Sequence, residues 1–310
     1  MLRANTFSEI LALAPEKEFA ITLGNFDGVH LGHQHLLNNI RYSCQRFNKE
    51  LIVVTFIPHP REILFPDQKH YLLTTYKNRR KLLKKLGIKY LIELPFTRDL
   101  STLTPSKFLH KLNFDKYPVT DFYIGYDFAF GANKEGNYEF LKNYLRDRKI
   151  NLHVQKEFKV ESITISSTWI RHLIRQGNVA NANKLLGKTY SINGTVIKGA
   201  GRGKTLGFPT ANIKYTENIL PPCCGVYATK TYHDSKVFKS ITNVGRNPTF
   251  LSSDEIGVET HLIDFEKDIY GENIEIEFHC KLRDEKKFES ADELVSQINK
   301  DQLKVIEYFS

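Results

Sequence analysis

The first half of the chain alternates between short apolar runs and segments in which apolar residues recur at helical spacing. The apolar runs predict buried strands at residues 19–23, 51–57, 88–94, 119–124 and 152–154. The helical spacing predicts helices at residues 34–47, 76–86, 105–113 and 137–148. Strands that alternate with helices favour an α/β fold with a parallel sheet, which binds its ligands at the carboxyl ends of the strands.

The pattern changes near residue 187. A helix predicted at residues 179–186 is followed by Gly187 and then by short strands separated by turn residues. These strands are predicted at residues 190–197, 226–232, 237–243, 258–264 and 274–280. They favour a small antiparallel β-barrel, followed by a C-terminal helix over residues 290–309. The sequence therefore predicts two domains, residues 1–186 and residues 187–310.

The composition is that of a globular protein without a membrane span. Of the 310 residues, 41% are hydrophobic and 25% are charged, and no apolar run reaches the length that crosses a bilayer. The N-terminus lacks the apolar core of a signal peptide. The four cysteines show neither a CxxC pair nor a Cys/His spacing typical of zinc. We therefore expect a cytoplasmic protein without a membrane partner, a zinc site or a disulfide framework.

Positive charge is concentrated in the first predicted domain. Residues 1–186 hold 28 Lys and Arg against 17 Asp and Glu, whereas residues 187–310 hold 16 against 18. A basic domain suits a polyphosphate substrate or nucleic acid. The densest basic run, residues 77–89, has leucines interleaved at helical spacing and lacks an aromatic stripe. It is therefore interpreted as an exposed helix face rather than as a nucleic-acid contact.

A glycine-rich turn with two histidines follows the first predicted strand. The strand leads into the run Gly24-Asn25-Phe26-Asp27-Gly28-Val29-His30-Leu31-Gly32-His33. The start of a helix offers unpaired N–H groups and a partial positive charge, which suit a phosphate group. His30 and His33 are three residues apart, so both can reach one phosphoryl group from the same helix face. The glycines leave space for the backbone to approach a nucleotide.

This run resembles the HxGH signature of nucleotidylyltransferases. In its longer form, G-x-F-D-G-x-H-x-G-H, it resembles the family of bifunctional riboflavin kinase/FMN adenylyltransferases, the prokaryotic FAD synthetases. The resemblance implies a Rossmann-like nucleotidylyltransferase domain followed by a six-stranded antiparallel β-barrel with riboflavin kinase activity. It also implies that His30 and His33 are catalytic and contact the phosphates of ATP. The other implied ATP-binding residues of this turn are Gly24, Asn25, Phe26 and Asp27, of which Asn25 and Asp27 either order the turn or contact the nucleotide.

Two segments of the first domain resemble further motifs of the same family. Residues 58–62, PHPRE, follow the second strand and resemble F-x-P-H-P-R-E, with Ile57 where a glutamate is usual. Residues 125–131 match G-x-D-F-x-F-G, although an ordinary aromatic core turn has the same pattern. The resemblance implies a flavin-binding role for Asp127, Phe128 and Phe130.

A third segment, residues 165–171, matches the family pattern I-S-S-T-x-I-R. Ser and Thr favour helix N-caps, and the apolar spacing that follows predicts a helix. Its N–H groups, hydroxyls and forked guanidinium are suitable ligands for a triphosphate. The resemblance implies that Arg171 takes part in catalysis and that Ser167 and Thr168 also bind ATP.

The second domain contains a glycine- and lysine-rich run that is not a P-loop. At residues 198–205, KGAGRGKT, Lys198 replaces the first glycine of that motif, and Pro209 follows where a helix would have to begin. The run 201–212 instead resembles riboflavin kinase, whose signature includes G-F-P-T-A-N. The resemblance implies that Thr210 and Asn212 bind Mg²⁺ and nucleotide, and oxygen ligands suit this hard cation. The other implied ATP ligands are Gly201, Arg202 and Gly203.

Later segments resemble the same family in the same order, at residues 243–250 and 258–262. The catalytic base of the family falls on Glu259. A carboxylate at this position can take the proton of the ribityl 5′-hydroxyl as it attacks the γ-phosphate of ATP. Residues 282–285 resemble L-R-x-E, which implies a flavin contact for Arg283, although a solvated charged loop has the same composition.

The sequence therefore predicts a bifunctional enzyme that phosphorylates riboflavin to FMN and then adenylylates FMN to FAD. Its expected partners are riboflavin, FMN, FAD and ATP, with Mg²⁺ as cofactor and without nucleic acid. We expect a monomer or a weak homo-oligomer. Two alternatives stay open: a nucleotidylyltransferase that acts on another phosphate compound, and a basic module that binds nucleic acid.

Overall fold

The chain forms two compact units in the computed structural model, which describes residues 1–12, 17–199, 201–215, 218–246 and 256–310. Unit 1 comprises Met1–His70 and Tyr76–Ile165, and unit 2 comprises Tyr71–Thr75 and Ser166–Ser310. The division at Ile165 precedes the predicted boundary at residue 187, because the two helices between them pack on each other and the second of them packs on the barrel of unit 2. That the catalytic domains meet at residue 187 stays a prediction.

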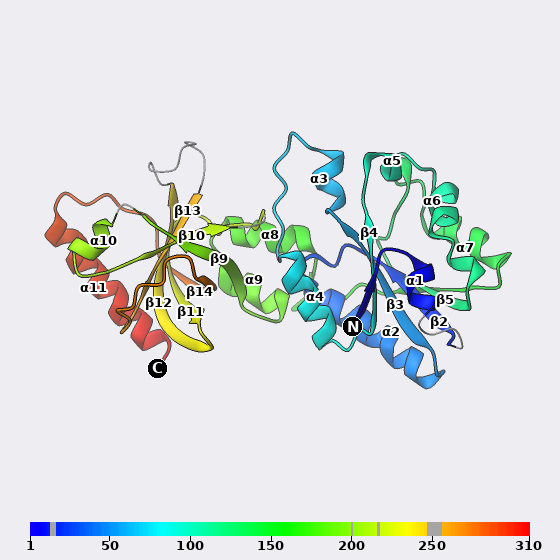
Figure 1. Ribbon diagram of the computed structural model, residues 1–310, viewed down its shortest axis with the longest axis horizontal. Helices are drawn as coiled ribbons and strands as arrows, with labels where there is room; N and C mark the ends of the chain where they lie inside the picture. Colours follow the sequence, from blue (N-terminus) through cyan, green and yellow to red (C-terminus); the bar gives the residue numbers. More distant parts are fainter. Residues whose placement is uncertain (13–16, 200, 216–217, 247–255) are drawn as a thin grey trace. The chain divides into compact units, whose positions relative to one another are not determined.

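Unit 1 contains the parallel sheet that the alternation of strands and helices predicts. Six strands, all parallel, lie in the order β1-β4-β3-β2-β5-β6 (Figure 1). They are β1 (Leu2–Ala4), β2 (Phe19–Leu23), β3 (Glu50–Ile57), β4 (Tyr90–Pro95), β5 (Val119–Gly125) and β6 (Asn151–Gln155). Every residue of β2 is buried, which is typical of a central strand that is covered on both faces.

Helices cover both faces of this sheet (Figure 1). On one face, α1, α5, α6 and α7 pack around Phe19 and Phe122, and on the other, α2 and α4 pack around Val53. The helices are α1 (Phe7–Leu11), α2 (Leu31–Arg46), α3 (Pro60–Leu64), α4 (Tyr76–Lys85), α5 (Arg98–Ser101), α6 (Pro105–Leu112) and α7 (Tyr138–Arg146). The shorter elements are η1 (Asp27–Val29), η2 (Phe114–Lys116), η3 (Ala132–Lys134), β7 (Lys159–Val160) and β8 (Ile163–Thr164).

The basic run at residues 77–89 lies mainly in α4, and its lysines are exposed as predicted. Arg79 is the exception, because only 2% of this residue is exposed. The predicted exposed helix face therefore holds for the lysines of the run, whereas Arg79 points into the unit. The physical reason is that the guanidinium finds main-chain carbonyl groups as partners inside the unit.

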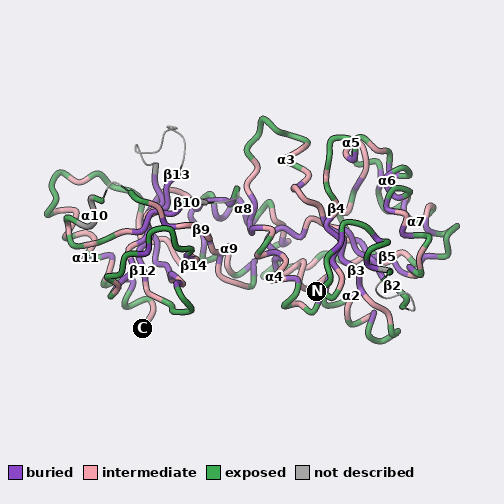
Figure 2. Tube along the Cα trace, in the orientation of Figure 1, coloured by how far each residue is buried: buried purple, intermediate pink, exposed green. Residues whose placement is uncertain are grey.

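Unit 2 contains the predicted antiparallel barrel, which is closed by six strands in the order β10-β13-β12-β11-β14-β9. The strands are β9 (Tyr190–Ile197), β10 (Ala211–Tyr215), β11 (Gly225–His233), β12 (Lys236–Arg246), β13 (Ile256–Leu262) and β14 (Asn273–Arg283). Buried and half-buried residues alternate along β9, so one side of this strand faces the interior of the barrel. Figure 2 shows that burial is concentrated in the strands of both units.

The helices of unit 2 are α8 (Ser167–Arg175), α9 (Val179–Leu186), α10 (Arg202–Thr205) and α11 (Ala291–Tyr308). The segment Tyr71–Thr75 joins this unit through a parallel bridge between Leu72 and Ile219. The N–H of Leu72 donates to the carbonyl of Asn218 at 2.7 Å, and the N–H of Leu220 donates to the carbonyl of Leu72 at 3.0 Å.

Four strands were missed by the sequence pattern: the two-residue strands β7 and β8, and the strands β1 and β10. The strand β1 is three residues long and pairs only with β4, which is distant in the sequence. The strand β10 lies next to Gly207 and Pro209, which signal a turn rather than a strand. It pairs with β9 and β13, and this pairing confirms the six-stranded barrel that the resemblance implied.

Candidate active sites

The glycine–histidine turn lies where the strand order of the sheet in unit 1 reverses. From β2 the chain continues to β3 on one side, and later it returns to β5 on the other side of β2. The turn follows β2, residues 58–62 follow β3, and residues 125–131 follow or end β5. Because the strands are parallel, these three motifs meet at one edge of the sheet. Open parallel sheets bind their ligands at this kind of reversal.

The backbone of the turn adopts conformations that are uncommon for residues with side chains. Phe26 and Val29 have φ values of 49° and 44°, and Gly28 has a φ of 81°. Such left-handed residues cost free energy and persist only where the surrounding packing holds them. The side chains of Phe26 and Val29 are buried in the core, which supplies that packing.

His30 and His33 form a stacked pair at the start of α2. Their ring centroids are 3.6 Å apart, with an angle of 16° between the planes. His30 is the N-cap of the helix, because its Nδ1 accepts a hydrogen bond from the N–H of His33 at 3.3 Å. A Cβ atom on Gly32 would lie 3.2 Å from this Nδ1, so the glycine leaves room for the ring. The edge of Phe26 supports His33 at a centroid distance of 5.2 Å.

The imidazole of His33 is uncharged at neutral pH. Burial lowers the pKa of His33 well below its usual value, and the neighbouring charge of His30 lowers it further. Its Nδ1 atom is buried and has no hydrogen-bond partner among the described residues. A buried polar atom without a partner is costly, and a bound ligand can remove this cost. The pair therefore offers ring nitrogens beside the free N–H groups of a helix start, which together suit a phosphate.

The aromatic segment after β5 is divided between the surface and the core. Phe130 is buried and packs on Phe108 and Phe140 at centroid distances of 5.4 Å and 6.1 Å. Phe128 is half-buried and stacks on Phe130 at 5.5 Å, and Asp127 is exposed. Asp127 and Phe128 are thus accessible to a ligand, whereas Phe130 supports them from within.

The predicted triphosphate ligands of residues 165–171 lie at the start of α8, in unit 2. Ser166 is the N-cap of this helix, since its Oγ accepts a hydrogen bond from the N–H of Trp169 at 3.2 Å. Arg171 is buried, and its Nε donates to the carbonyl of Tyr71 at 2.9 Å. Ser167 is half-buried, and Thr168 is exposed.

In the barrel, the strand register places Glu259 between two asparagines. Asn212 of β10 and Asn243 of β12 each pair directly with Glu259 of β13. Residues that are directly opposite each other on neighbouring strands point to the same face of the sheet. The three side chains therefore share a face. Sequence reasoning missed Asn243 as a site residue, because only the register reveals its position opposite Glu259.

The loop before β10 passes close to the predicted Mg²⁺ ligands. A Cβ atom on Gly199 would lie 2.1 Å from Nδ2 of Asn212, and one on Gly203 would lie 3.3 Å from Oγ1 of Thr210. Any larger residue at position 199 would therefore displace the Asn212 side chain. The two glycines form a cradle around an amide and a hydroxyl, whose oxygen atoms are the type of ligand that Mg²⁺ prefers.

Of the remaining predicted kinase residues, the structure describes Gly201 and Arg283 but not the side chain of Arg202. Gly201 has a φ of 73°, a conformation that favours glycine. The side chain of Arg202 and residues 247–250 lie outside the described residues. Arg283 donates through Nε to Oδ2 of the buried Asp301 at 2.8 Å, and this ion pair links β14 to α11. Its predicted flavin contact stays a prediction.

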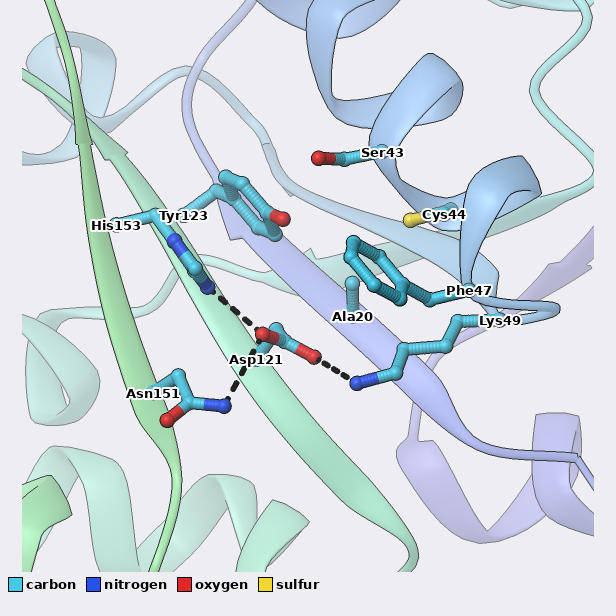
Figure 3. Close-up of a pocket in the computed structure, with 9 residues that line it drawn as sticks. All are labelled: Ala20, Ser43, Cys44, Phe47, Lys49, Asp121, Tyr123, Asn151 and His153. Carbon is cyan, nitrogen blue, oxygen red and sulfur yellow. Dashed lines mark hydrogen bonds and ion pairs between the residues drawn. The ribbon is translucent and has the colours of Figure 1, made fainter.

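A cavity at the opposite, amino-terminal edge of the sheet in unit 1 encloses about 240 Å³ (Figure 3). It is lined by Ala20, Ser43, Cys44, Phe47, Lys49, Asp121, Tyr123, Asn151 and His153, none of which the sequence predicted as a site residue. Lys49 donates to Asp121 at 2.6 Å, and Nε2 of His153 lies 2.7 Å from the same carboxylate. Burial alone would raise the pKa of Asp121, but hydrogen bonds from Lys49, His153 and Thr120 outweigh it and lower the pKa to about 2.

We expect Asp121→Asn to reduce the free energy of unfolding of unit 1 by about 2 kcal/mol at pH 7. A carboxyl group whose pKa is lowered by folding stabilises the fold above its unfolded pKa. This contribution therefore fades as the pH falls from about 4 to about 2. Urea unfolding followed by circular dichroism at neutral and acidic pH measures the difference.

The chain offers two controls for this experiment. Glu18→Gln removes an exposed carboxylate that lies 3.7 Å from the same Lys49, and we expect a smaller loss because exposed ion pairs contribute little. Trp169, the only tryptophan, lies in unit 2, so its fluorescence should keep its unfolding midpoint in both variants. Equal losses in Asp121→Asn and Glu18→Gln would contradict the prediction.

Comparisons with known proteins match two different family models to two parts of the chain. Residues 13–169 match the family model described as FAD synthetase, and residues 186–309 match the model described as riboflavin kinase. A bifunctional riboflavin kinase/FMN adenylyltransferase of Bacillus subtilis (strain 168) is 34% identical over 297 residues, which cover 94% of this chain and 92% of that protein. A protein of the same description from Escherichia coli (strain K12) is 33% identical over 300 residues, with coverages of 96% and 95%.

A solved structure described as a macrolide-efflux protein from Streptococcus pneumoniae has a TM-score of 0.84 and 30% identity, and the match covers 97% of both chains. The fold is thus shared over almost the entire chain. Among the residues that the structure describes, none of the helices combines the length and the hydrophobicity that a membrane span requires.

Proposed function

The chain belongs to the family of bifunctional riboflavin kinase/FMN adenylyltransferases, and we propose that its two activities use the separate groups of residues described above. The segment 186–309 is a riboflavin kinase, which converts riboflavin and ATP to FMN. The segment 13–169 is an FAD synthetase, which joins FMN to the adenylyl group of ATP and releases pyrophosphate. The observation that carries the residue assignment is the stacked His30–His33 pair beside the reversal of strand order.

Adenylyl transfer requires no nucleophile from the protein. A phosphate oxygen of FMN attacks the α-phosphorus of ATP, and pyrophosphate leaves with the electron pair of the bond that breaks. The protein must therefore align two anionic substrates and stabilise the charge that develops on the phosphoryl oxygens. His30 and His33 contact these oxygens together with the N–H groups at the start of α2. The unpartnered Nδ1 of His33 supports this assignment.

The other residues of the adenylyltransferase site have supporting roles. Asp27 is almost fully buried, which favours ordering of the turn over direct contact with the nucleotide. Asn25 is half-buried beside Gly24 and is the more accessible of the two. The exposed Asp127 and half-buried Phe128 contact the flavin. The resemblance in sequence alone supports the further proposal that Arg171, Ser167 and Thr168 of α8 bind the triphosphate.

In the kinase site, Glu259 accepts the proton of the ribityl 5′-hydroxyl as this oxygen attacks the γ-phosphorus of ATP. Thr210 and Asn212 would hold Mg²⁺, and the close approach of Gly199 and Gly203 to their side chains supports this assignment. When bound, Mg²⁺ neutralises phosphate charge and orients the terminal phosphate. Asn212 and Asn243, which flank Glu259 in the register, orient its carboxylate and the hydroxyl that it deprotonates.

We expect Gly199→Ala to lower kcat/KM of the kinase for ATP by about tenfold or more, because the new methyl group displaces the Asn212 amide. FAD formation from FMN should not change. Lys198→Ala is the matched control, since it removes atoms from the neighbouring residue and adds none near Asn212. Steady-state kinetics of both reactions test this. An unchanged kcat/KM in Gly199→Ala would show that the kinase does not need the space that Gly199 leaves for Asn212.

The overall proposal is tested by incubating the purified full chain with riboflavin and MgATP and separating the flavin products by chromatography. FMN should accumulate first, and FAD should follow. Failure to convert FMN would refute the adenylyltransferase assignment and favour a nucleotidylyltransferase with another phosphate acceptor. We further propose that the protein acts in the cytoplasm as a monomer or weak homo-oligomer, which size-exclusion chromatography with light scattering can test.

A further inference from the structure

Arg79 is a buried cation that none of the assignments above uses. It lies in α4, and only 2% of the residue is exposed. Burying a guanidinium costs free energy unless the group is paired and hydrogen-bonded. One of its donors, Nε, has no hydrogen-bond partner among the described residues. A residue that served only the packing of the core could be replaced by an apolar side chain without this cost.

The two hydrogen bonds that Arg79 donates both go to main-chain carbonyls at the edge of the sheet where the motifs meet. Nη1 donates to the carbonyl of Asn25 at 2.9 Å, and Nη2 donates to the carbonyl of Phe56 at 3.3 Å. The hydroxyl of Thr55 donates to the same Asn25 carbonyl at 3.2 Å. Asn25 directly precedes the left-handed Phe26. The guanidinium thus links the peptide between Asn25 and Phe26, in the glycine–histidine turn, to the end of β3.

Two carboxylates stabilise the charge of this guanidinium. Oε1 of Glu93 lies 3.8 Å from Nη2 of Arg79. Burial lowers the pKa of Arg79, while the negative charges of Glu93 and Asp27 oppose this shift. The cation therefore interacts with a carboxylate of β4 and with the buried carboxylate of the turn itself. The ring of Tyr76 covers the guanidinium at 4.9 Å.

We propose that Arg79 is a positioning residue for adenylyl transfer, which fixes the turn after β2 and thereby the places of His30 and His33. The inference rests on the adenylyltransferase assignment of that histidine pair. Arg79 does not touch the substrate in this role, because it is buried. A lysine would keep the charge but lacks the planar fork that bonds the carbonyls of Asn25 in the turn and Phe56 in β3 at once.

The test compares Arg79→Met, Arg79→Lys and Arg80→Met in the full chain, with FMN and ATP as substrates. We expect Arg79→Met to lower kcat of FAD formation by about tenfold to a hundredfold, with a much smaller change in KM for ATP, because the histidines are misplaced rather than lost. Arg79→Lys should restore part of kcat. Arg80→Met is the matched control, since Arg80 donates to both oxygens of Glu93 at 2.9 Å but, among the residues that the structure describes, makes no hydrogen bond to the turn.

Circular dichroism melting shows whether each variant is folded, and riboflavin kinase activity of the same chains should be unchanged. A folded Arg79→Met with the kcat of the wild type overturns the proposal, as does an equal loss of kcat in Arg79→Met and Arg80→Met. If Arg79→Met does not fold, Arg79→Lys decides: a reduced kcat with little change in KM supports the proposal, and a wild-type kcat overturns it. A wild-type chain that forms no FAD would instead refute the adenylyltransferase assignment.

Discussion

Replacement of both His30 and His33 by alanine is expected to stop FAD formation and to leave FMN formation intact. The two rings stack at 3.6 Å over the start of α2, so the double variant removes all ring nitrogens from the phosphate position at once. Loss of a single preorganised donor to a developing charge commonly slows a reaction by about a hundredfold to a thousandfold. We therefore expect the double variant to lose at least about a thousandfold in kcat.

The two single variants should each lose nearly as much as the double variant. His30 accepts the hydrogen bond of the His33 N–H, so either substitution disturbs the pair as a unit. Chromatography of the products from FMN and MgATP measures FAD formation. The same assay with riboflavin and MgATP measures FMN formation.

His35→Ala provides the control for these variants. It removes an exposed histidine of the same helix, which stacks on Phe158 rather than on the pair. Both activities should survive this change. Loss of both activities from a folded His30→Ala/His33→Ala chain would contradict the assignment of two separate sites.

Glu259→Gln is expected to have the reverse effect, with loss of FMN formation and retention of FAD formation from added FMN. Glutamine keeps the size of the side chain between Asn212 and Asn243 but cannot accept a proton. General-base catalysis typically contributes a factor of about 10² to 10⁴, so kcat of the kinase should fall by that amount. KM for ATP should change little, because ATP is held by other residues.

The control for this variant is Glu266→Gln, which removes an exposed carboxylate of the same unit. It should leave both activities unchanged. A Glu259→Gln chain that phosphorylates riboflavin at the rate of the wild type would show that another group takes the proton. Tryptophan fluorescence of Trp169 reports whether unit 2 remains folded in each variant.

Local sequence determined most of the secondary structure and the motifs of both sites. The apolar run at 19–23, the glycines that follow and the helical spacing after them specify a strand, a turn and a helix within one stretch of chain. Ser166 caps a helix, as the hydroxyl-rich segment predicted, because an N-cap needs only its own neighbours. The five predicted strands of the barrel were found for the same reason.

The partners of these elements were decided only by the tertiary structure. No local pattern indicates that β1 pairs with β4, that Tyr71–Thr75 joins unit 2, or that Asn243 lies opposite Glu259. Arg79 illustrates the difference most clearly, because it lies in a run whose lysines are exposed, whereas its own partners are the carbonyls of Asn25 in the glycine–histidine turn and of Phe56 in β3. Backbone preferences and helix caps act over a few residues, whereas strand pairing and burial depend on which distant surfaces give the lowest free energy together.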